Sequence, residues 1–179
     1  MRDEPISPTD GRADQSGGAE GAGDTSVTRD VDLDASIERV WEALTEPEAL
    51  AEWMGGPSEL DARPGGGGRV TDAETATVRR VLVTESDPGR RLAFTWWPDD
   101  DGDGVASEVR FDLTPSGGGT RLTVTERPLV APSGITVSAS AATPRPTPGW
   151  CSSAAGAWTW RLAALELRCA ALLRRPAGA

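Results

Sequence analysis

One carboxylate is a candidate for chemistry, Glu126. It ends an alternating run in which Leu122, Val124 and Glu126 share one face of a predicted strand. If the strand stays regular to that point, Glu126 points into the interior, where desolvation raises the pKa of a carboxyl group and leaves it an acid or a hydrogen-bond partner for a ligand. If the strand ends earlier, Glu126 pairs with Arg127 or Arg121 in water, the commoner arrangement for glutamate. The sequence leaves both interpretations open.

Further carboxylates match the start of a calcium-binding loop. The matching positions are Asp99, Asp101, Asp103 and Gly104, with Ser107 at the ninth place. The twelfth place, which holds a bidentate Glu in such loops, is Arg110, and predicted strands replace the flanking helices. We therefore predict a solvated acidic hairpin and no metal site.

A run of four glycines, 65–68, is a candidate phosphate loop. Neither the Lys and Ser/Thr of a P-loop nor a helix follows it, however. We therefore expect no phosphate site here, and predict a short strand at 69–71 after the glycines.

Missing residue types exclude other chemistry. The 179 residues contain no His, Lys, Tyr or Asn, so all 18 basic residues are Arg. Without His there is no Ser-His or Cys-His nucleophile pair and no imidazole metal ligand, and without Lys there is no Schiff base. Any catalysis would fall to carboxylates, Arg, Ser or Cys. We predict no catalytic residue and no cofactor.

Charge and hydropathy limit the partners. The net charge of −10 argues against nucleic acid, because phosphate binding needs a basic surface. The N-terminus has no apolar signal region, and no run approaches membrane-spanning length. Cys151 and Cys169 lie about 27 Å apart if both belong to one helix, too far for a disulfide. These features predict a cytoplasmic protein without membrane insertion.

The element that positions the candidate residues is the last helix, predicted from Ser153 to about Arg174. One apolar stripe recurs at helical spacing: Trp158, Leu162, Leu165, Cys169 and Leu172. The charged positions Arg161, Glu166, Arg168 and Arg175 fall on other faces, where we expect water to reach them. A stripe this long needs a broad apolar partner, which predicts a curved sheet around the helix.

The preceding chain supplies that sheet. A strand at 27–33 is followed by two short helices, at 37–44 and 47–54. Alternating segments then predict strands at 69–71, 75–84, 91–97, 109–113 and 122–126, joined by short polar turns. The predicted class is α+β, with six to seven antiparallel strands wrapped around a long C-terminal helix.

Composition predicts one domain with polar segments around and within it. Residues 1–26 contain little that is apolar and predict a disordered, acidic, Gly-rich tail. Residues 27–175 form the domain, interrupted at 128–149 by a Pro-, Ser- and Thr-rich insertion, and 176–179 form a second tail. The insertion is either a mobile lid over one end of the sheet or a disordered insertion. Its middle has little to bury, which favours the second interpretation.

Several stretches resemble the helix-grip superfamily called SRPBCC or START-like. They are 31–47 (VDLDASIERVWEALTEP), 53–57 (WMGGP), 87–96 (DPGRRLAFTW), 119–126 (GTRLTVTE) and 158–166 (WTWRLAALE). The most similar branch is the one named for the activator of heat-shock protein 90 ATPase. The resemblance covers about residues 27–128 and 152–174, and the Pro-rich insertion departs from the pattern.

The resemblance implies a cavity between the last helix and the concave sheet face, which superfamily members use for lipids, hydrophobic hormones or polyketide intermediates. The residues expected to line it are Trp41, Phe94, Trp96, Phe111, Val124, Glu126, Trp158 and Leu162. The apolar members are equally explained as ordinary core residues.

Two further tryptophans, Trp53 and Trp97, are harder to bury. Trp97 should point opposite to Trp96 by strand alternation, and an exposed Trp can mark a contact surface.

Three functions remain open. The first is a non-catalytic helix-grip domain that binds a small apolar or amphipathic molecule. The alternatives are an enzyme of cyclase or dehydratase type that uses Glu126 with an Arg, and a co-chaperone-like protein-interaction module that uses Trp97 and the long loop. A closed, all-apolar cavity would count against the enzyme, and a filled one against both ligand-binding functions.

The predicted N-terminal tail gives a first test. Deleting residues 1–24 should leave the melting temperature nearly unchanged, because a segment with so few apolar side chains contributes little to a core. Thermal unfolding of the full and shortened chains, followed by circular dichroism, checks this. A large drop would mean that the segment docks on the domain.

Overall fold

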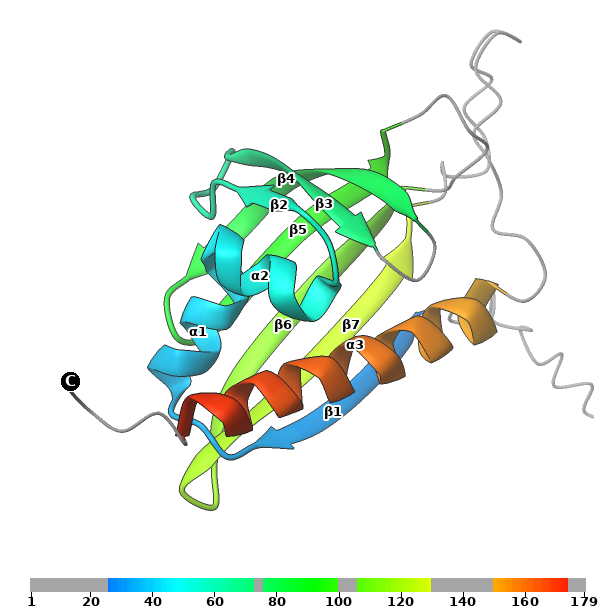
Figure 1. The fold of residues 1–179 in the computed structure, drawn as a ribbon. Coiled ribbons are helices and arrows are strands. Elements are labelled where there is room, and N and C mark those ends of the chain that lie inside the picture. Colours follow the sequence, from blue (N-terminus) through cyan, green and yellow to red (C-terminus); the bar gives the residue numbers. More distant parts are fainter. Residues whose placement is uncertain (1–25, 73–75, 100–105, 130–149, 174–179) are drawn as a thin grey trace, which may run out of the picture.

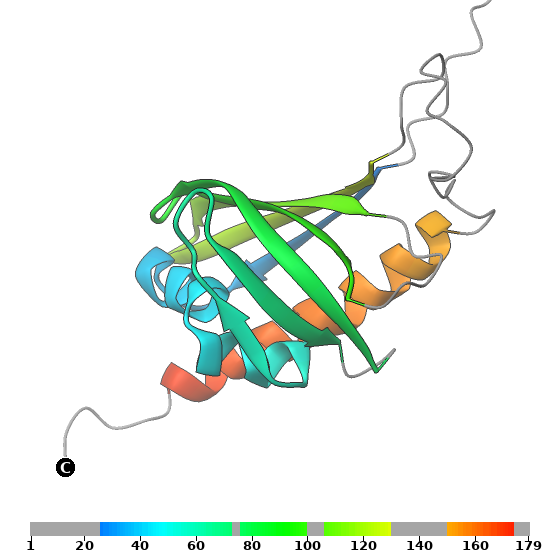
Figure 2. The same cartoon turned by 90° about the horizontal axis from the view of Figure 1, so that it is seen from above.

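The chain wraps a curved antiparallel sheet around one long helix (Figures 1 and 2). The structure is a computed structural model that describes residues 26–72, 76–99, 106–129 and 150–173; in the last segment, side chains are described from 154 to 171. The predictions for the tail before residue 26, the insertion from residue 130 and the end from residue 174 lie outside these ranges. No helix in the described ranges is long and apolar enough to cross a membrane.

The sheet is a meander of seven strands. They are β1 (Val27–Leu33), β2 (Ser58–Leu60), β3 (Gly67–Asp72), β4 (Thr77–Asp87), β5 (Arg91–Pro98), β6 (Ser107–Ser116) and β7 (Gly119–Pro128). Their order across the sheet is β1-β7-β6-β5-β4-β3-β2, and each neighbouring pair is antiparallel. A bulge in β4 between Val83 and Glu85 adds local bending. The predicted α+β meander is confirmed, with β2 added where no alternation marks a strand.

Two short helices, α1 (Ile37–Thr45) and α2 (Pro47–Met54), separate β1 from β2. Pro47 occupies the first turn of α2, where its missing N–H leaves no hydrogen bond unmade. Gly55 ends α2 with a φ of 85°, a conformation that a side chain would disfavour. Both helices cover the same face of the sheet as the last helix (Figure 1).

The last helix, α3 (Trp150–Leu173), lies along β1 on the concave side of the sheet (Figure 1). The predicted stripe is confirmed at Trp158, Leu162, Leu165 and Cys169, all of which are buried. The side chain of Leu172 and all of Arg175 lie outside the described ranges. Glu166 is exposed, as predicted.

The prediction that water reaches Arg161 and Arg168 was wrong. Arg161 is only 5% exposed because it meets a carboxylate of β3 inside the fold. Arg168 is largely covered and forms an ion pair with Glu52 of α2. Both guanidinium groups therefore lie where α3 contacts other elements.

Trp53 is also more buried than its sequence context indicates. Its ring is 1% exposed, and its indole N–H donates to the carbonyl oxygen of Ala43 at 2.8 Å. This bond satisfies the one polar atom of the side chain, which removes the cost of burying it. The residue joins α2 to α1 and to the core.

The glycine run at 65–68 packs two strands closely. A Cβ added to Gly66 would lie 2.2 Å from the Asp61 carbonyl oxygen, and one added to Gly68 would lie 2.1 Å from that of Glu59. The glycines therefore let β3 approach β2 and the turn before it, as a structural loop requires. The predicted strand at 69–71 lies within β3.

The inner stripe of α3 gives a stability test. Leu165 is fully buried, so Leu165→Ala should lower the free energy of unfolding by about 2–5 kcal/mol. Leu167 lies on the same helix but is 74% exposed, so Leu167→Ala should change stability by no more than about 0.5 kcal/mol. Urea melts of both variants test the packing. Equal losses would contradict it.

Candidate functional site

A small apolar hollow lies between α3, α2 and the sheet. It is lined by Leu44, Leu50, Trp53, Met54, Leu60, Val70, Val81, Phe94, Trp96, Phe111 and Trp158. Its free volume is about 10 Å³, room for no more than one water molecule. Side chains therefore fill this part of the interior, and a larger guest can enter it only if some of them move.

Four of the eight predicted wall residues line this hollow: Phe94, Trp96, Phe111 and Trp158. The others do not; Val124, Glu126 and Leu162 are buried, and Trp41 is half-buried against the core. The sequence prediction missed the lining from α2, namely Leu50, Trp53 and Met54. The helical spacing of these three residues was the signal that could have identified them.

The aromatic residues form one contact group. Trp96 of β5 stacks on Trp158 of α3, with ring centroids 5.9 Å apart and planes at 23°. Phe111 meets Trp158 edge-on at 5.6 Å, and Phe94 meets Trp96 at 5.8 Å. Both indole N–H groups are thereby buried, and each needs an acceptor.

Glu126 is that acceptor. Its Oε1 accepts the indole N–H of Trp96 at 2.9 Å and the hydroxyl of Ser107, and its Oε2 accepts the indole N–H of Trp158 at 2.7 Å. Glu126 is 4% exposed because β7 stays regular through Pro128. Of the two interpretations left open, the structure therefore has the inward one.

The two arginines near Glu126 in the sequence, Arg121 and Arg127, form ion pairs with other carboxylates. Arg127 pairs with Glu108 at 2.5 Å, and Arg121 pairs with Asp32 at 2.7 Å. Both pairs lie on the outer face of the sheet, because residues 121 and 127 alternate with the inward positions of β7.

Arg161 adds a second buried charge pair. Its guanidinium donates to Asp72 at the end of β3, and both side chains are almost fully buried. The same guanidinium lies 5.4 Å from the ring of Trp96 and 5.0 Å from that of Trp158. Its Nε nevertheless has no hydrogen-bond partner among the residues that the structure describes.

Arg79 of β4 brings a second cation to Trp96. Its guanidinium carbon lies 4.6 Å from the ring centroid, and its buried Nε has no hydrogen-bond partner within the described part of the chain. Burial lowers the pKa of Arg79 below its ordinary value, while the charge of Glu126 acts in the opposite direction. Arg79 forms no ion pair with any residue that the structure describes.

These groups form a polar cluster, which we define as Asp72, Arg79, Trp96, Ser107, Glu126, Trp158 and Arg161. Five of its residues lie near the ends of β3, β5 and β7 and the starts of β4 and β6, and the other two, Trp158 and Arg161, lie in α3. It contains two carboxylates and two guanidinium groups. Glu126 accepts hydrogen bonds from three donors, and Asp72 accepts one from Arg161. The groups of the cluster that remain available to a ligand are therefore the Nε donors of Arg79 and Arg161.

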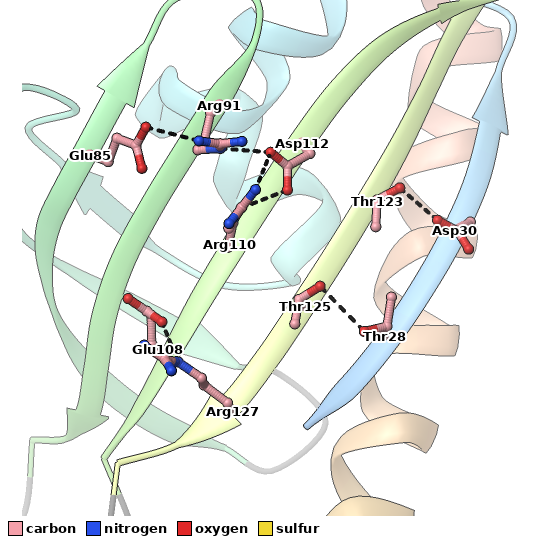
Figure 3. A network of polar contacts seen from close by, with 10 residues as sticks. All are labelled: Thr28, Asp30, Glu85, Arg91, Glu108, Arg110, Asp112, Thr123, Thr125 and Arg127. Carbon is pink, nitrogen blue, oxygen red and sulfur yellow. Dashed lines mark hydrogen bonds and ion pairs between the residues drawn. The ribbon is translucent and has the colours of Figure 1, made fainter. Parts of the chain in front are cut away.

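The outer face of the sheet carries exposed charges of both signs (Figure 3). Glu85, Arg91, Asp112 and Arg110 form one chain of ion pairs, and Glu108 pairs with Arg127 in another. A shallow depression of about 500 Å³ lies between them, with Ala93 and Thr125 among its lining residues. These charges are paired with one another, as on an ordinary solvated sheet surface.

The segment that matches the start of a calcium-binding loop, predicted to be a solvated acidic hairpin, is only partly described. Asp101, Asp103 and Gly104 lie outside the described ranges, whereas Asp99 pairs with Arg69 at 3.2 Å and Arg80 at 3.4 Å. Ser107 donates to Glu126 instead of facing the loop. Within the described ranges, no group of three or more carboxylates or cysteines is arranged to hold a metal.

Sequence comparison places this geometry in a family. Residues 34–162 match the family model of Activator of Hsp90 ATPase homolog 1-like proteins. The chain belongs to this family. The match spans α1, α2, β2 to β7 and the first part of α3, so it includes every residue of the polar cluster. Among curated proteins, no sequence matches the chain.

Solved structures share the fold of this family member. Protein MLL2253 from Mesorhizobium loti is 21% identical, with a TM-score of 0.63 over 79% of this chain and 94% of that one. DynU16, described as a putative protein in the dynemicin biosynthetic locus, is 24% identical, with a TM-score of 0.62 over 80% of this chain and 46% of that one. The Aha1 dimer from Colwellia psychrerythraea is 15% identical, with a TM-score of 0.57 over 79% and 92%. These similarities establish the helix-grip fold.

The contacts of Glu126 predict a structural cost for its loss. Glu126→Gln replaces one acceptor oxygen with an amide, which leaves a buried indole or hydroxyl donor unsatisfied. Stability should fall by about 1–3 kcal/mol. Glu108→Gln makes the same change in an outer ion pair and should cost no more than about 1 kcal/mol. Urea melts compare the two; a Glu126→Gln variant as stable as the parent would contradict the network.

Proposed function

We propose that the protein is a non-catalytic binding domain for a small amphipathic molecule, held between α3 and the sheet. The observation that carries this proposal is the pair of unpartnered donors at the polar cluster. The Nε atoms of Arg79 and Arg161 are buried without an acceptor in the described ranges, and both guanidinium groups lie against Trp96. Such a site favours a ligand with a carboxylate or another anionic acceptor.

The physical reason is the cost of an unsatisfied buried donor. A polar group buried without a hydrogen-bond partner costs about 1–3 kcal/mol, and more when it is charged. An acceptor on the ligand would remove that cost for both guanidinium groups. Planar guanidinium donors suit a carboxylate, which can accept two bonds side by side.

The apolar part of the ligand would lie toward the hollow. Trp96 and Trp158 belong to both the polar cluster and the lining of the hollow, so they connect the two. Because the hollow holds about one water, an apolar body needs space that α2 side chains now fill. Binding is therefore expected to shift Leu50, Trp53 and Met54.

The arrangement of Glu126 weighs against the cyclase or dehydratase alternative. A general acid or base needs an oxygen within reach of the substrate proton. Both oxygens of Glu126 already accept hydrogen bonds from the protein, and those bonds hold α3 to the sheet. The membership of DynU16 in a biosynthetic locus agrees with a small-molecule ligand and assigns no reaction to this chain.

A protein-interaction module is the second candidate. Trp97 is half-buried on the outer face of the sheet, opposite Arg80 in the strand register. The neighbouring strand β4 exposes Val78 and Leu82 on that face. This small apolar group could contact a partner protein, and it is independent of the polar cluster.

Ligand binding can be tested with matched probes. We expect aliphatic and aromatic carboxylates to raise the melting temperature and change tryptophan fluorescence, and the corresponding neutral amides to do so less. Native mass spectrometry of the purified protein provides a second readout, through any molecule that co-purifies. If no probe changes either signal and nothing co-purifies, the proposed binding function is wrong.

Two adjacent arginines provide the control. Arg79 points into the cluster, whereas Arg80 points outward and pairs with Asp99. Arg79→Met should weaken carboxylate binding by about tenfold or more, the loss expected for one charge-assisted hydrogen bond. Arg80→Met should leave it unchanged. Equal effects of the two variants would argue that attraction to the overall surface charge, not the cluster, binds the anion.

A further inference from the structure

The charged groups of the polar cluster are not all paired in the same way. Arg161 donates directly to Asp72, and these two side chains are almost fully buried. Glu126 accepts its hydrogen bonds from uncharged donors, namely two indole N–H groups and one hydroxyl. Arg79 is therefore the one cation of the cluster that has no carboxylate in direct contact among the described residues.

The charges of the cluster cancel, because it contains two carboxylates and two guanidinium groups. A ligand whose head group carries one negative charge gives the occupied cluster a single net negative charge, and a doubly charged head group gives it two. The cost of holding a net charge away from water rises with the square of that charge, so a second charge makes it about four times as large. The charge of the head group therefore has a strong effect on binding.

The gain in hydrogen bonds does not rise in the same way. Arg79 and Arg161 each present one buried Nε donor without an acceptor in the described ranges, so a singly charged head group with two oxygens satisfies both. A second charge on that head group lies next to the carboxylate of Asp72, which already holds Arg161, and like charges repel. The gain is complete with the first charge, whereas the cost continues to rise.

We propose that the site accepts amphipathic molecules whose head group carries one negative charge, and that Asp72 sets this limit. Asp72 ends β3, and its carboxylate occupies the side of Arg161 that a second ligand charge would need. The inference rests on the binding function proposed above and narrows its ligand to carboxylates, sulfates or sulfonates with one charge. Phosphate monoesters with two charges are excluded. Asp72 is thus a specificity-determining residue that acts through the charge of the cluster.

Two surfactants of the same length test the charge limit in the unaltered protein. Octyl sulfate and octyl phosphate share a tail and a tetrahedral head group, but the phosphate gains a second charge when it loses its second proton at about pH 6. At about pH 8, octyl sulfate should bind at least about tenfold more tightly than octyl phosphate, whereas at about pH 5 the two affinities should agree within about threefold. Isothermal titration calorimetry measures both. Octyl sulfate keeps one charge throughout and so controls for the titration of protein groups.

Asp72→Asn isolates the contribution of this carboxylate. The change keeps the size of the side chain and removes one negative charge, so at about pH 8 the preference for octyl sulfate over octyl phosphate should fall by about tenfold or more. Asp32→Asn removes the same charge from an exposed ion pair with Arg121 and should change the preference by no more than about twofold. This control accounts for the overall negative charge of the protein. Circular dichroism checks the fold of both variants.

The possible results separate this inference from the binding function on which it rests. Equal binding of octyl sulfate and octyl phosphate at about pH 8 would overturn the charge limit and leave the binding function standing. Equal preferences in Asp72→Asn and Asp32→Asn would overturn the role of Asp72. If neither surfactant binds and octanoate does not bind either, the binding function fails and this inference fails with it. If Asp72→Asn does not fold, the comparison of the two surfactants at the two pH values still decides the charge limit.

Discussion

The hydrogen bonds to Glu126 fix how the last helix sits on the sheet. Apolar packing holds α3 in the concave face, but it is non-directional and permits small rotations and slides. The carboxylate of β7 accepts donors from β5, β6 and α3 at once. A buried charge is tolerated only where such partners meet it, so these bonds strongly favour one rotation and one height of the helix.

The same constraint places the two cations. Once Trp158 is held by Glu126, the neighbouring Arg161 reaches Asp72 and lies over two indole rings. Arginine suits this environment because its guanidinium is planar, weakly hydrated and able to stack on aromatic faces. Because the sequence contains no Lys, every basic residue that could occupy this site is an Arg, whose guanidinium can stack on an aromatic ring.

The outer surfaces of sheet and helix follow different rules. On the sheet, charges of opposite sign pair with their cross-strand neighbours, which leaves a polar, self-satisfied face (Figure 3). On α3, the positions opposite the core are Ala, Gly, Trp and Leu. The helix therefore buries one apolar side against the sheet and exposes Trp160 and Leu167 on the opposite side.

The sequence by itself determined the architecture. The period of the α3 stripe and the alternation of strands such as 91–97 are local, and burial needs only one face of each, so they predict the α+β meander without knowledge of contacts. The same alternation placed Trp96 inside and Trp97 outside.

The tertiary structure decided the composition of the site. Arg161 lies 89 positions from Asp72 in the sequence. Helical periodicity alone predicts that a charged residue at position 161 is exposed to water, because it carries no information about so distant a partner. Glu126 could be assigned inward only once β7 was known to stay regular and to meet Ser107 and Trp158. The hollow is nearly filled because side chains from eight elements meet there, and their combined volume cannot be read from the sequence pattern of any one element.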